Sequence, residues 1–199
     1  MTTRSDALPE VLLDELALAR RVTQLADEIT RDHPDGVVLV GVLKGALVFF
    51  ADVARRVRGI DVAVDFLAIS RYAPDSGRVR LLKDLDLDVT DRDVVIVEDL
   101  VDTGLTLAYL IEHLTARGAR RVEICALLDR SDRRIVPLSL RYVGTSIPGD
   151  AFVLGYGLHV GDKYRNLPFV VRVDPAVLGE DPDAYLSLYG RGVGEPGPM

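Results

Sequence analysis

The sequence predicts an α/β fold in which a mainly parallel sheet is flanked by helices. Residues 37–43 and 94–97 are continuous apolar runs rich in β-branched residues, and such runs are typical of strands buried on both faces of a parallel sheet. Segments with helical spacing alternate with these strands, as right-handed crossovers require. The length of 199 residues, of which 48% are hydrophobic, fits one domain with its own core, which we place at residues 1–189.

The first predicted helix lies between Pro9 and His33, where apolar residues recur at helical spacing from Leu18 to Ile29. The pattern then gives strand 37–43, helix 46–57, strand 62–70, strand 94–97 and a helix from about 106 to 117. Further strands are predicted at 122–128, 140–143, 152–155 and 169–173. Because ligands of such folds bind beyond the carboxyl ends of the strands, we expect the functional site there.

A β-hairpin flap is predicted at residues about 68–88. Residues 71–78 have turn chemistry, and beyond them Leu85, Leu87 and Val89 alternate with aspartates, as in a half-exposed strand. The Gly/Pro-rich residues 190–199 are expected to form a frayed tail without function.

Charge and cysteine content narrow the functional classes. The 24 basic and 31 acidic residues give a net charge of -7, which argues against sequence-independent binding of nucleic acid. The single Cys125 cannot form an internal disulfide, and we expect it to be a buried residue on a strand. No apolar run approaches the ~20 residues of a membrane span, and the N-terminus lacks a signal-peptide pattern. We therefore expect a cytoplasmic protein with no membrane partner.

The most informative segment is Val94–Thr106, VVIVEDLVDTGLT, in which a buried strand ends in carboxylates before a helix begins. The adjacent acids Glu98 and Asp99 can accept hydrogen bonds from a ribose diol and can hold Mg²⁺, which prefers oxygen ligands. Asp102–Thr106 can wrap a phosphate, because Gly104 permits close approach and the following helix supplies free N–H groups. The hydroxyls of Thr103 and Thr106 are further donors.

A purely structural interpretation of these residues stays open at this point. Asp and Thr are common helix N-caps, and an acidic strand end is often only a solvated turn. The segment also lacks both the dinucleotide-binding glycine pattern and the G-x-x-x-x-G-K-[ST] phosphate loop, which argues against those two classes.

The whole string VVIVEDLVDTGLT resembles the phosphoribosyl pyrophosphate (PRPP) signature of type I phosphoribosyltransferases. The hypoxanthine-guanine branch matches best, and the resemblance extends over most of the chain through GVLKGALVFFADVARRV, VDFLAIS, RYVGTSIP, FVLGYGL and KYRNL. It implies the type I phosphoribosyltransferase fold, with the hairpin flap and a small hood made of the N-terminal helix and residues about 145–175. A homodimer or homotetramer is also implied.

The resemblance assigns the ribose and phosphate contacts to the acidic segment. It implies that Glu98 and Asp99 bind the ribose hydroxyls, directly and through Mg²⁺, and that Asp102 lies near N7 of the purine as the proton acceptor. The 5′-phosphate is expected on the loop of Asp102, Thr103, Gly104, Leu105 and Thr106.

The remaining implied contacts come from other parts of the chain. Pyrophosphate is expected on the backbone amides of Leu43, Lys44 and Gly45, often across a non-proline cis peptide bond, and on Arg165. The purine is expected to stack on Phe152, to meet the backbone of Val153 and to receive a hydrogen bond from Arg130. In the flap, Tyr72 is expected to close over the reacting centre.

Three positions depart from the family pattern. Arg130 stands where a lysine is usual, and Arg71 precedes Tyr72 where a serine is usual. His159 stands where the family has an aspartate that holds a second Mg²⁺, and imidazole is a poor ligand for that cation. Asp162, three residues further on, is the candidate replacement.

Two functions follow as hypotheses. The first is a purine salvage enzyme that transfers the phosphoribosyl group of PRPP to a 6-oxopurine such as hypoxanthine or guanine and releases pyrophosphate; xanthine or a modified purine is the alternative base. The second is a non-catalytic regulator that binds PRPP or a nucleotide on the same fold.

Overall fold

The computed structural model describes residues 9–70 and 80–190 of the chain. Within these residues the chain divides into two compact units. The larger unit comprises the described part of Ala19–Gly149, and the smaller unit combines the described parts of Met1–Leu18 and Asp150–Met199.

A six-stranded sheet forms the centre of the larger unit and has the order β4-β3-β2-β5-β6-β7. Its strands are β2 (Val37–Leu43), β3 (Val62–Ser70), β4 (Arg80–Lys83), β5 (Asp93–Val101), β6 (Arg121–Asp129) and β7 (Tyr142–Ser146). All neighbouring strands are parallel except the antiparallel pair β3–β4. The predicted α/β fold with a mainly parallel sheet is therefore confirmed.

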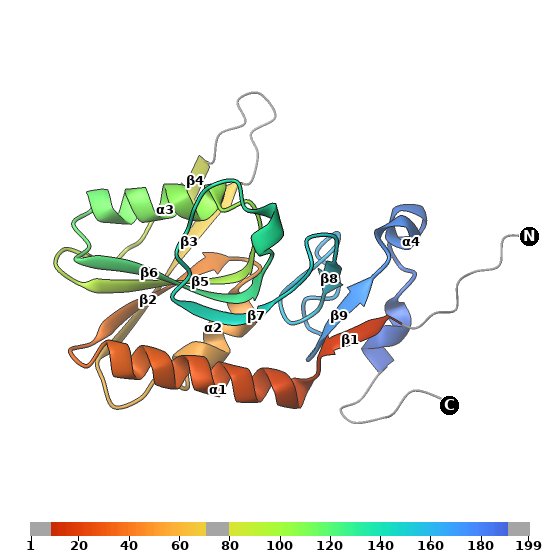
Figure 1. Cartoon of the computed structure of the whole chain (residues 1–199), viewed down its shortest axis with the longest axis horizontal. Helices are drawn as coiled ribbons and strands as arrows, with labels where there is room; N and C mark the ends of the chain where they lie inside the picture. The colour runs from red at the N-terminus through yellow and green to blue at the C-terminus, as the bar shows by residue number, and fades with distance from the viewer. Residues whose placement is uncertain (1–8, 71–79, 191–199) are drawn as a thin grey trace, which may run out of the picture. The chain divides into compact units, whose positions relative to one another are not determined.

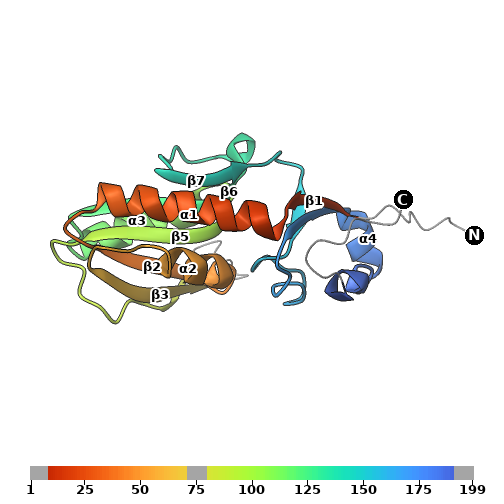
Figure 2. The same cartoon turned by 90° about the horizontal axis from the view of Figure 1, so that it is seen from below.

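Helices cover both faces of this sheet. Figures 1 and 2 show α1 (Glu15–Asp32) and α2 (Leu47–Ala54) on one face and α3 (Leu105–Ala116) on the other. Val38, Val40 and Ile96 of the sheet pack in one cluster with Leu110 and Leu114 of α3. Because strand side chains alternate between faces, the apolar runs β2 and β5 supply core to both layers.

Helix α1 starts later than predicted. Its N-cap is Asp14, whose Oδ1 accepts the N–H of Ala17 at 2.7 Å. Residues Glu10–Leu13, assigned to the helix from the sequence, instead form strand β1, which pairs antiparallel with β9. That part of the prediction was wrong because a partner strand about 160 residues away decides the conformation of a short apolar segment.

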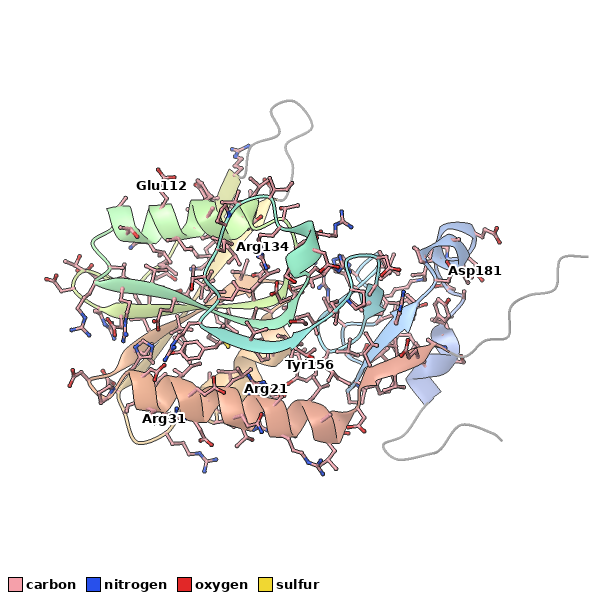
Figure 3. All side chains as sticks on the ribbon, in the orientation of Figure 1. Arg21, Arg31, Glu112, Arg134, Tyr156 and Asp181 are labelled. Carbon is pink, nitrogen blue, oxygen red and sulfur yellow. The ribbon has the colours of Figure 1, made fainter. Side chains whose placement is uncertain are left out.

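Helix α1 is also hydrogen-bonded to β7. Arg21 of α1 donates to the carbonyls of Val143 and Gly144 at 2.6 and 3.0 Å (Figure 3).

The smaller unit contains a three-stranded antiparallel sheet of order β1-β9-β8. The strands β8 (Phe152–Leu154) and β9 (Val170–Val173) lie within the predicted strands 152–155 and 169–173. A short helix that was not predicted, α4 (Pro175–Glu180), follows β9 and is capped by Asp174. The core of the smaller unit includes Leu154, Tyr164, Val171 and Leu178.

The second strand of the flap lies at β4 and not at residues 85–89. The reason is that aspartate side chains take the backbone N–H groups that a strand would use. Oδ2 of Asp65 accepts the N–H groups of Asp86 and Leu87 at 2.8 and 2.9 Å, and Oδ1 of Asp84 accepts that of Leu85 at 2.7 Å. Leu85 and Val89 are buried and Leu87 is half-buried, although the segment is irregular and does not form a strand.

Other boundaries differ by a few residues. Helix α2 ends at Ala54 rather than residue 57, after which the N–H of Arg56 bonds to the carbonyl of Val53 in a tighter turn. Strand β7 begins at Tyr142, which pairs with Cys125, rather than at residue 140. Cys125 lies on β6 and is fully buried, as predicted, and burial raises the pKa of its thiol. Among the helices the structure describes, none is both long and apolar enough for a membrane crossing.

Candidate active site

Two buried carboxylates, Glu98 and Asp99, lie near the carboxyl end of β5. Strand β2 is the parallel neighbour of β5, so the turn that follows β2 lies beside them. Gly45 of this turn is in contact with Asp99: a Cβ at Gly45 would be 1.9 Å from Oδ2 of the carboxylate. Only a glycine therefore allows the turn and the carboxylate to be neighbours.

The peptide bond between Leu43 and Lys44 is cis, which matches the geometry expected from the resemblance. It lies in the turn that joins β2 to α2, and the side chain of Lys44 is exposed. The turn is tied at both ends, since Ala46 N–H donates to Val42 and Leu47 N–H donates to Lys44.

The bend Asp102–Thr106 connects β5 to α3. Gly104 is the N-cap of α3 and has φ = 85°, in the left-handed region. A Cβ there would also be 2.9 Å from Leu138 and 3.0 Å from Arg134, so close packing excludes a side chain. The N–H groups in the first turn of a helix have no intrahelical partner, so the start of α3 suits an anion such as phosphate. The N–H of Leu105 lies 3.5 Å from Oγ1 of Thr103.

Two arginines flank the carboxylate of Asp102. Nη1 of Arg130 lies 3.9 Å from Oδ2, and Nε of Arg133 lies 3.1 Å from Oδ1. Arg130 is only 8% exposed, and this burial lowers the pKa of its guanidinium although Asp102 opposes the shift. Arg133 was not singled out from the sequence; its place follows from the 3₁₀ turn Ser131–Arg133 after β6.

The segment after β6 is fastened to the bend by backbone hydrogen bonds. Arg130 N–H donates to Val101, and the N–H groups of Ile135 and Val136 donate to Thr103 at 2.9 and 3.2 Å. Arg134, labelled in Figure 3, pairs with Asp129 and packs its side chain against Gly104. The bend and both arginines next to Asp102 therefore form one connected structure.

The other predicted contacts belong to the smaller unit. Phe152 and Val153 lie on β8, where Phe152 is half-buried and Val153 is buried. Arg165 donates from Nη1 to the carbonyl of Gly157 and from Nη2 to Oδ1 of Asp162, both at 2.7 Å. Nδ1 of His159 accepts the N–H of Asp162 at 3.1 Å.

The candidate metal ligands in the larger unit are Glu98 and Asp99 of β5. Glu98 and Asp99 offer carboxylate oxygens, and Mg²⁺ is typically held by one or two carboxylates together with phosphates of a substrate. In the described part of the chain, no three His, Cys, Asp or Glu side chains form a ready metal cluster. The donor set at β5 therefore fits a magnesium ion that is completed by substrate oxygens.

Arg71 and Tyr72, the predicted flap residues, lie outside the described residues.

Comparison with known proteins gives one consistent result. A family model described as phosphoribosyl transferase domain matches residues 10–160. The hypoxanthine-guanine phosphoribosyltransferase of Bacillus subtilis (strain 168) is 40% identical over 174 residues, which cover 85% of this chain and 96% of the relative. The hypoxanthine phosphoribosyltransferase of Escherichia coli (strain K12) is 39% identical over 170 residues, covering 82% of this chain and 94% of the relative.

Solved structures agree with these relatives. A hypoxanthine-guanine phosphoribosyltransferase from Bacillus anthracis, with HEPES in its active site, is 41% identical and has a TM-score of 0.77 over 82% of this chain and 95% of that chain. A hypoxanthine phosphoribosyltransferase from Staphylococcus aureus is 36% identical and has a TM-score of 0.80 over 87% of this chain and 98% of that chain.

Proposed function

The chain belongs to the phosphoribosyl transferase domain family and is a phosphoribosyltransferase, and from this premise we propose that it makes purine nucleotides from PRPP and a 6-oxopurine. Pyrophosphate is the second product, and the reaction serves purine salvage. The observation that carries the proposal is that the bend Asp102–Thr106 follows strand β5, which holds the buried pair Glu98 and Asp99 near its carboxyl end. We further propose that both compact units belong to one phosphoribosyltransferase domain, residues 1–189, in a cytoplasmic homodimer or homotetramer.

The acidic pair and the bend hold the phosphoribosyl group. Glu98 and Asp99 accept hydrogen bonds from the ribose hydroxyls and hold Mg²⁺. When bound, this cation supplies charge that stabilises the departing pyrophosphate. The 5′-phosphate lies on Asp102–Thr106, where Gly104 allows close approach and the N–H groups at the start of α3 donate.

Pyrophosphate contacts the turn Leu43-Lys44-Gly45 through backbone amides and Arg165 through its guanidinium. A planar guanidinium suits the oxygens of this anion. Within the smaller unit, the guanidinium of Arg165 is held by its hydrogen bonds to Gly157 and Asp162.

The base is recognised by Arg130, Asp102, Phe152 and Val153. The guanidinium of Arg130 only donates hydrogen bonds, so it favours a purine with an oxygen at position 6 over one with an amino group. Asp102 accepts the proton of the base, Phe152 stacks on the ring and Val153 meets its edge through the backbone. In the flap, Tyr72 with the adjacent Arg71 closes the site against water.

The reaction breaks the bond between ribose C1 and the pyrophosphate oxygen and forms a bond from C1 to a purine nitrogen. Positive charge builds on the sugar ring, and the buried carboxylates of Glu98 and Asp99 stabilise it. The proton on N7 of the purine goes to the carboxylate of Asp102, which is expected beside that nitrogen. Lys44 and Arg165 add positive charge near the leaving group.

His159 is not a suitable ligand for a second Mg²⁺. Imidazole is a poor ligand for this hard cation, and Nδ1 of His159 accepts the N–H of Asp162. Asp162 remains the candidate for that metal, and in the structure its Oδ1 pairs with Arg165.

The test is turnover with PRPP, Mg²⁺ and a panel of hypoxanthine, guanine, xanthine and adenine. We expect pyrophosphate release with a 6-oxopurine and none with adenine.

Asp102→Asn should lower kcat by about 10²–10³-fold and leave the affinity for PRPP largely intact, because a positioned proton acceptor contributes to catalysis on that order. Asp27→Asn, at an exposed position of α1, is the matched control. PRPP binding without release for any purine would instead support the regulator.

A further inference from the structure

We propose that Arg133 positions the carboxylate of Asp102 so that the opposite oxygen, Oδ2, faces the purine. This inference rests on the proposed function, because it concerns the proton acceptor of the same reaction. Arg133 acts through Asp102 and is therefore a positioning residue rather than a catalytic one.

The two oxygens of Asp102 have different surroundings. Oδ1 is buried from solvent and accepts no hydrogen bond from the described residues, and Nε of Arg133 lies 3.1 Å from it as an ion pair. A buried carboxylate oxygen is costly unless a donor or a positive charge compensates it, and Arg133 supplies that charge. Oδ2 lies on the side of Arg130, with Nη1 at 3.9 Å. The positive charge of Arg133 thus favours the rotation of the carboxylate that keeps Oδ1 beside it, which leaves Oδ2 next to the proposed donor to the base.

Arg133 is itself held in place by its own segment. Its N–H donates to the carbonyl of Arg130 at 3.1 Å within the 3₁₀ turn. Its side-chain stem lies against Gly149, where a Cβ would be 3.0 Å from Cγ of Arg133. The neighbouring Asp132 accepts the N–H of Gly149 at 3.1 Å, which fixes this glycine beside the stem.

The exposure of the pair indicates orientation rather than stability as its role. The side chains of Arg133 and Asp102 are 53% and 38% exposed, and ion pairs of this exposure add little to the free energy of unfolding. Arg134, the next residue, is placed differently, because it pairs with Asp129 and packs on Gly104. Within the turn Ser131–Arg133, Arg133 forms an ion pair with Asp102 at 3.1 Å.

The experiment compares Arg133→Gln and Arg133→Lys in the parent and in the Asp102→Asn background. We expect Arg133→Gln to lower kcat about 10-fold with KM for PRPP within about 3-fold of the parent. Arg133→Lys keeps the positive charge and should recover most of the loss. In the Asp102→Asn background, Arg133→Gln should add less than about 2-fold, since a residue that acts through Asp102 has nothing left to position. Arg58→Gln, at an exposed site after α2, is the control.

Three results would overturn the inference: an unchanged kcat in Arg133→Gln, the same fold-loss in both backgrounds, or no recovery in Arg133→Lys. The thermal midpoints of all variants show whether a loss of kcat comes from unfolding. A loss of kcat that comes from unfolding also counts against the positioning role of Arg133. Failure of the proposed function is distinguishable, because the parent itself would then release no pyrophosphate. If the parent is active and Asp102→Asn is not, an unaffected Arg133→Gln refutes the positioning role alone.

Discussion

Gly45 and Asp99 show how a single hydrogen atom in place of a side chain permits the site. A methyl group at residue 45 would lie 1.9 Å from Oδ2 of Asp99, a distance that no relaxed structure accepts. Either the cis turn after β2 or the buried carboxylate must then move. We expect Gly45→Ala to weaken PRPP binding by at least about 10-fold, a loss of about 1.4 kcal/mol, measured by calorimetric titration.

The matched control is Gly179→Ala in α4, where a Cβ would meet no atom within 4 Å. Alanine has a higher helix propensity than glycine. The free energy of unfolding of this variant should therefore equal that of the parent or exceed it by about 0.5–1 kcal/mol. Unchanged PRPP affinity in Gly45→Ala would show that contact between the turn and Asp99 is dispensable.

At single positions, the sequence identifies residues whose role depends on their immediate neighbours in the chain. The acids Glu98 and Asp99 and the glycine of the bend could be predicted because strand, carboxylates and helix start follow one another. Lys44 and Arg130 carry no local signal, and only the family resemblance points to them. Arg133 was missed because its ion pair depends on the turn after β6, whose course a sequence pattern does not determine.

Asp65 on β3 fastens the irregular segment 84–89 to the sheet. Its carboxylate accepts the N–H groups of Phe66, Asp86 and Leu87, and Lys83 lies 3.4 Å away. Burial opposes its ionisation, but these hydrogen bonds outweigh it, so the pKa of Asp65 is lowered. We expect Asp65→Asn to reduce the free energy of unfolding by about 2 kcal/mol in urea denaturation. Asp86→Asn, whose side chain is 85% exposed, should change it by less than about 0.5 kcal/mol.

Asp93 lies at the amino end of β5, the end opposite the candidate active site. It connects β5 with the start of β6 and the end of α1. Its carboxylate accepts hydrogen bonds from Arg120 at 2.8 Å and Arg121 at 3.1 Å and lies 2.9 Å from Nδ1 of His33 at the end of α1. Burial opposes ionisation, yet the bonds from Arg120, Arg121 and His33 prevail, and the pKa of Asp93 is strongly lowered. The charged form of Asp93 therefore stabilises the native state.

The sign of the pH effect follows from this direction. A carboxyl with a lowered native-state pKa contributes stability above its unfolded pKa of about 3.9 and loses it as the pH falls below that value. We expect Asp93→Asn to have a lower thermal midpoint than the parent at pH 7, with a gap that narrows from about pH 4 downward. A gap that stays constant to pH 3 would contradict this role.

The elements that could be predicted are those with a strong local pattern. The strands β2 and β5, which are buried on both faces, the strand β3 and the amphipathic part of α1 could be predicted without knowledge of their partners. Strand β1 exists only because β9 pairs with it, and residues 84–89 are irregular because Asp65 captures their N–H groups. Both depend on contacts between segments that are separated in the sequence, and the pattern of a single segment does not contain them.

Across the larger unit, the turn after β2, the bend after β5 and the segment after β6 meet at the carboxyl ends of neighbouring parallel strands. The position of the site followed from the fold class, since parallel strands present their carboxyl ends at one edge. The network around Asp93 lies at the other ends of the same strands and is separate from the proposed chemistry. The stabilising network around Asp93 and the proposed catalytic groups therefore lie at opposite ends of the same strands.

A crystal structure with bound inosine 5′-monophosphate tests most directly whether this edge binds a phosphoribosyl group. We predict that the phosphate accepts hydrogen bonds from the N–H groups of Gly104, Leu105 and Thr106, that the ribose hydroxyls contact Glu98 and Asp99, and that the base faces Asp102 and Arg130. A phosphate bound elsewhere, with the bend occupied only by the protein's own side chains, would contradict the proposed function.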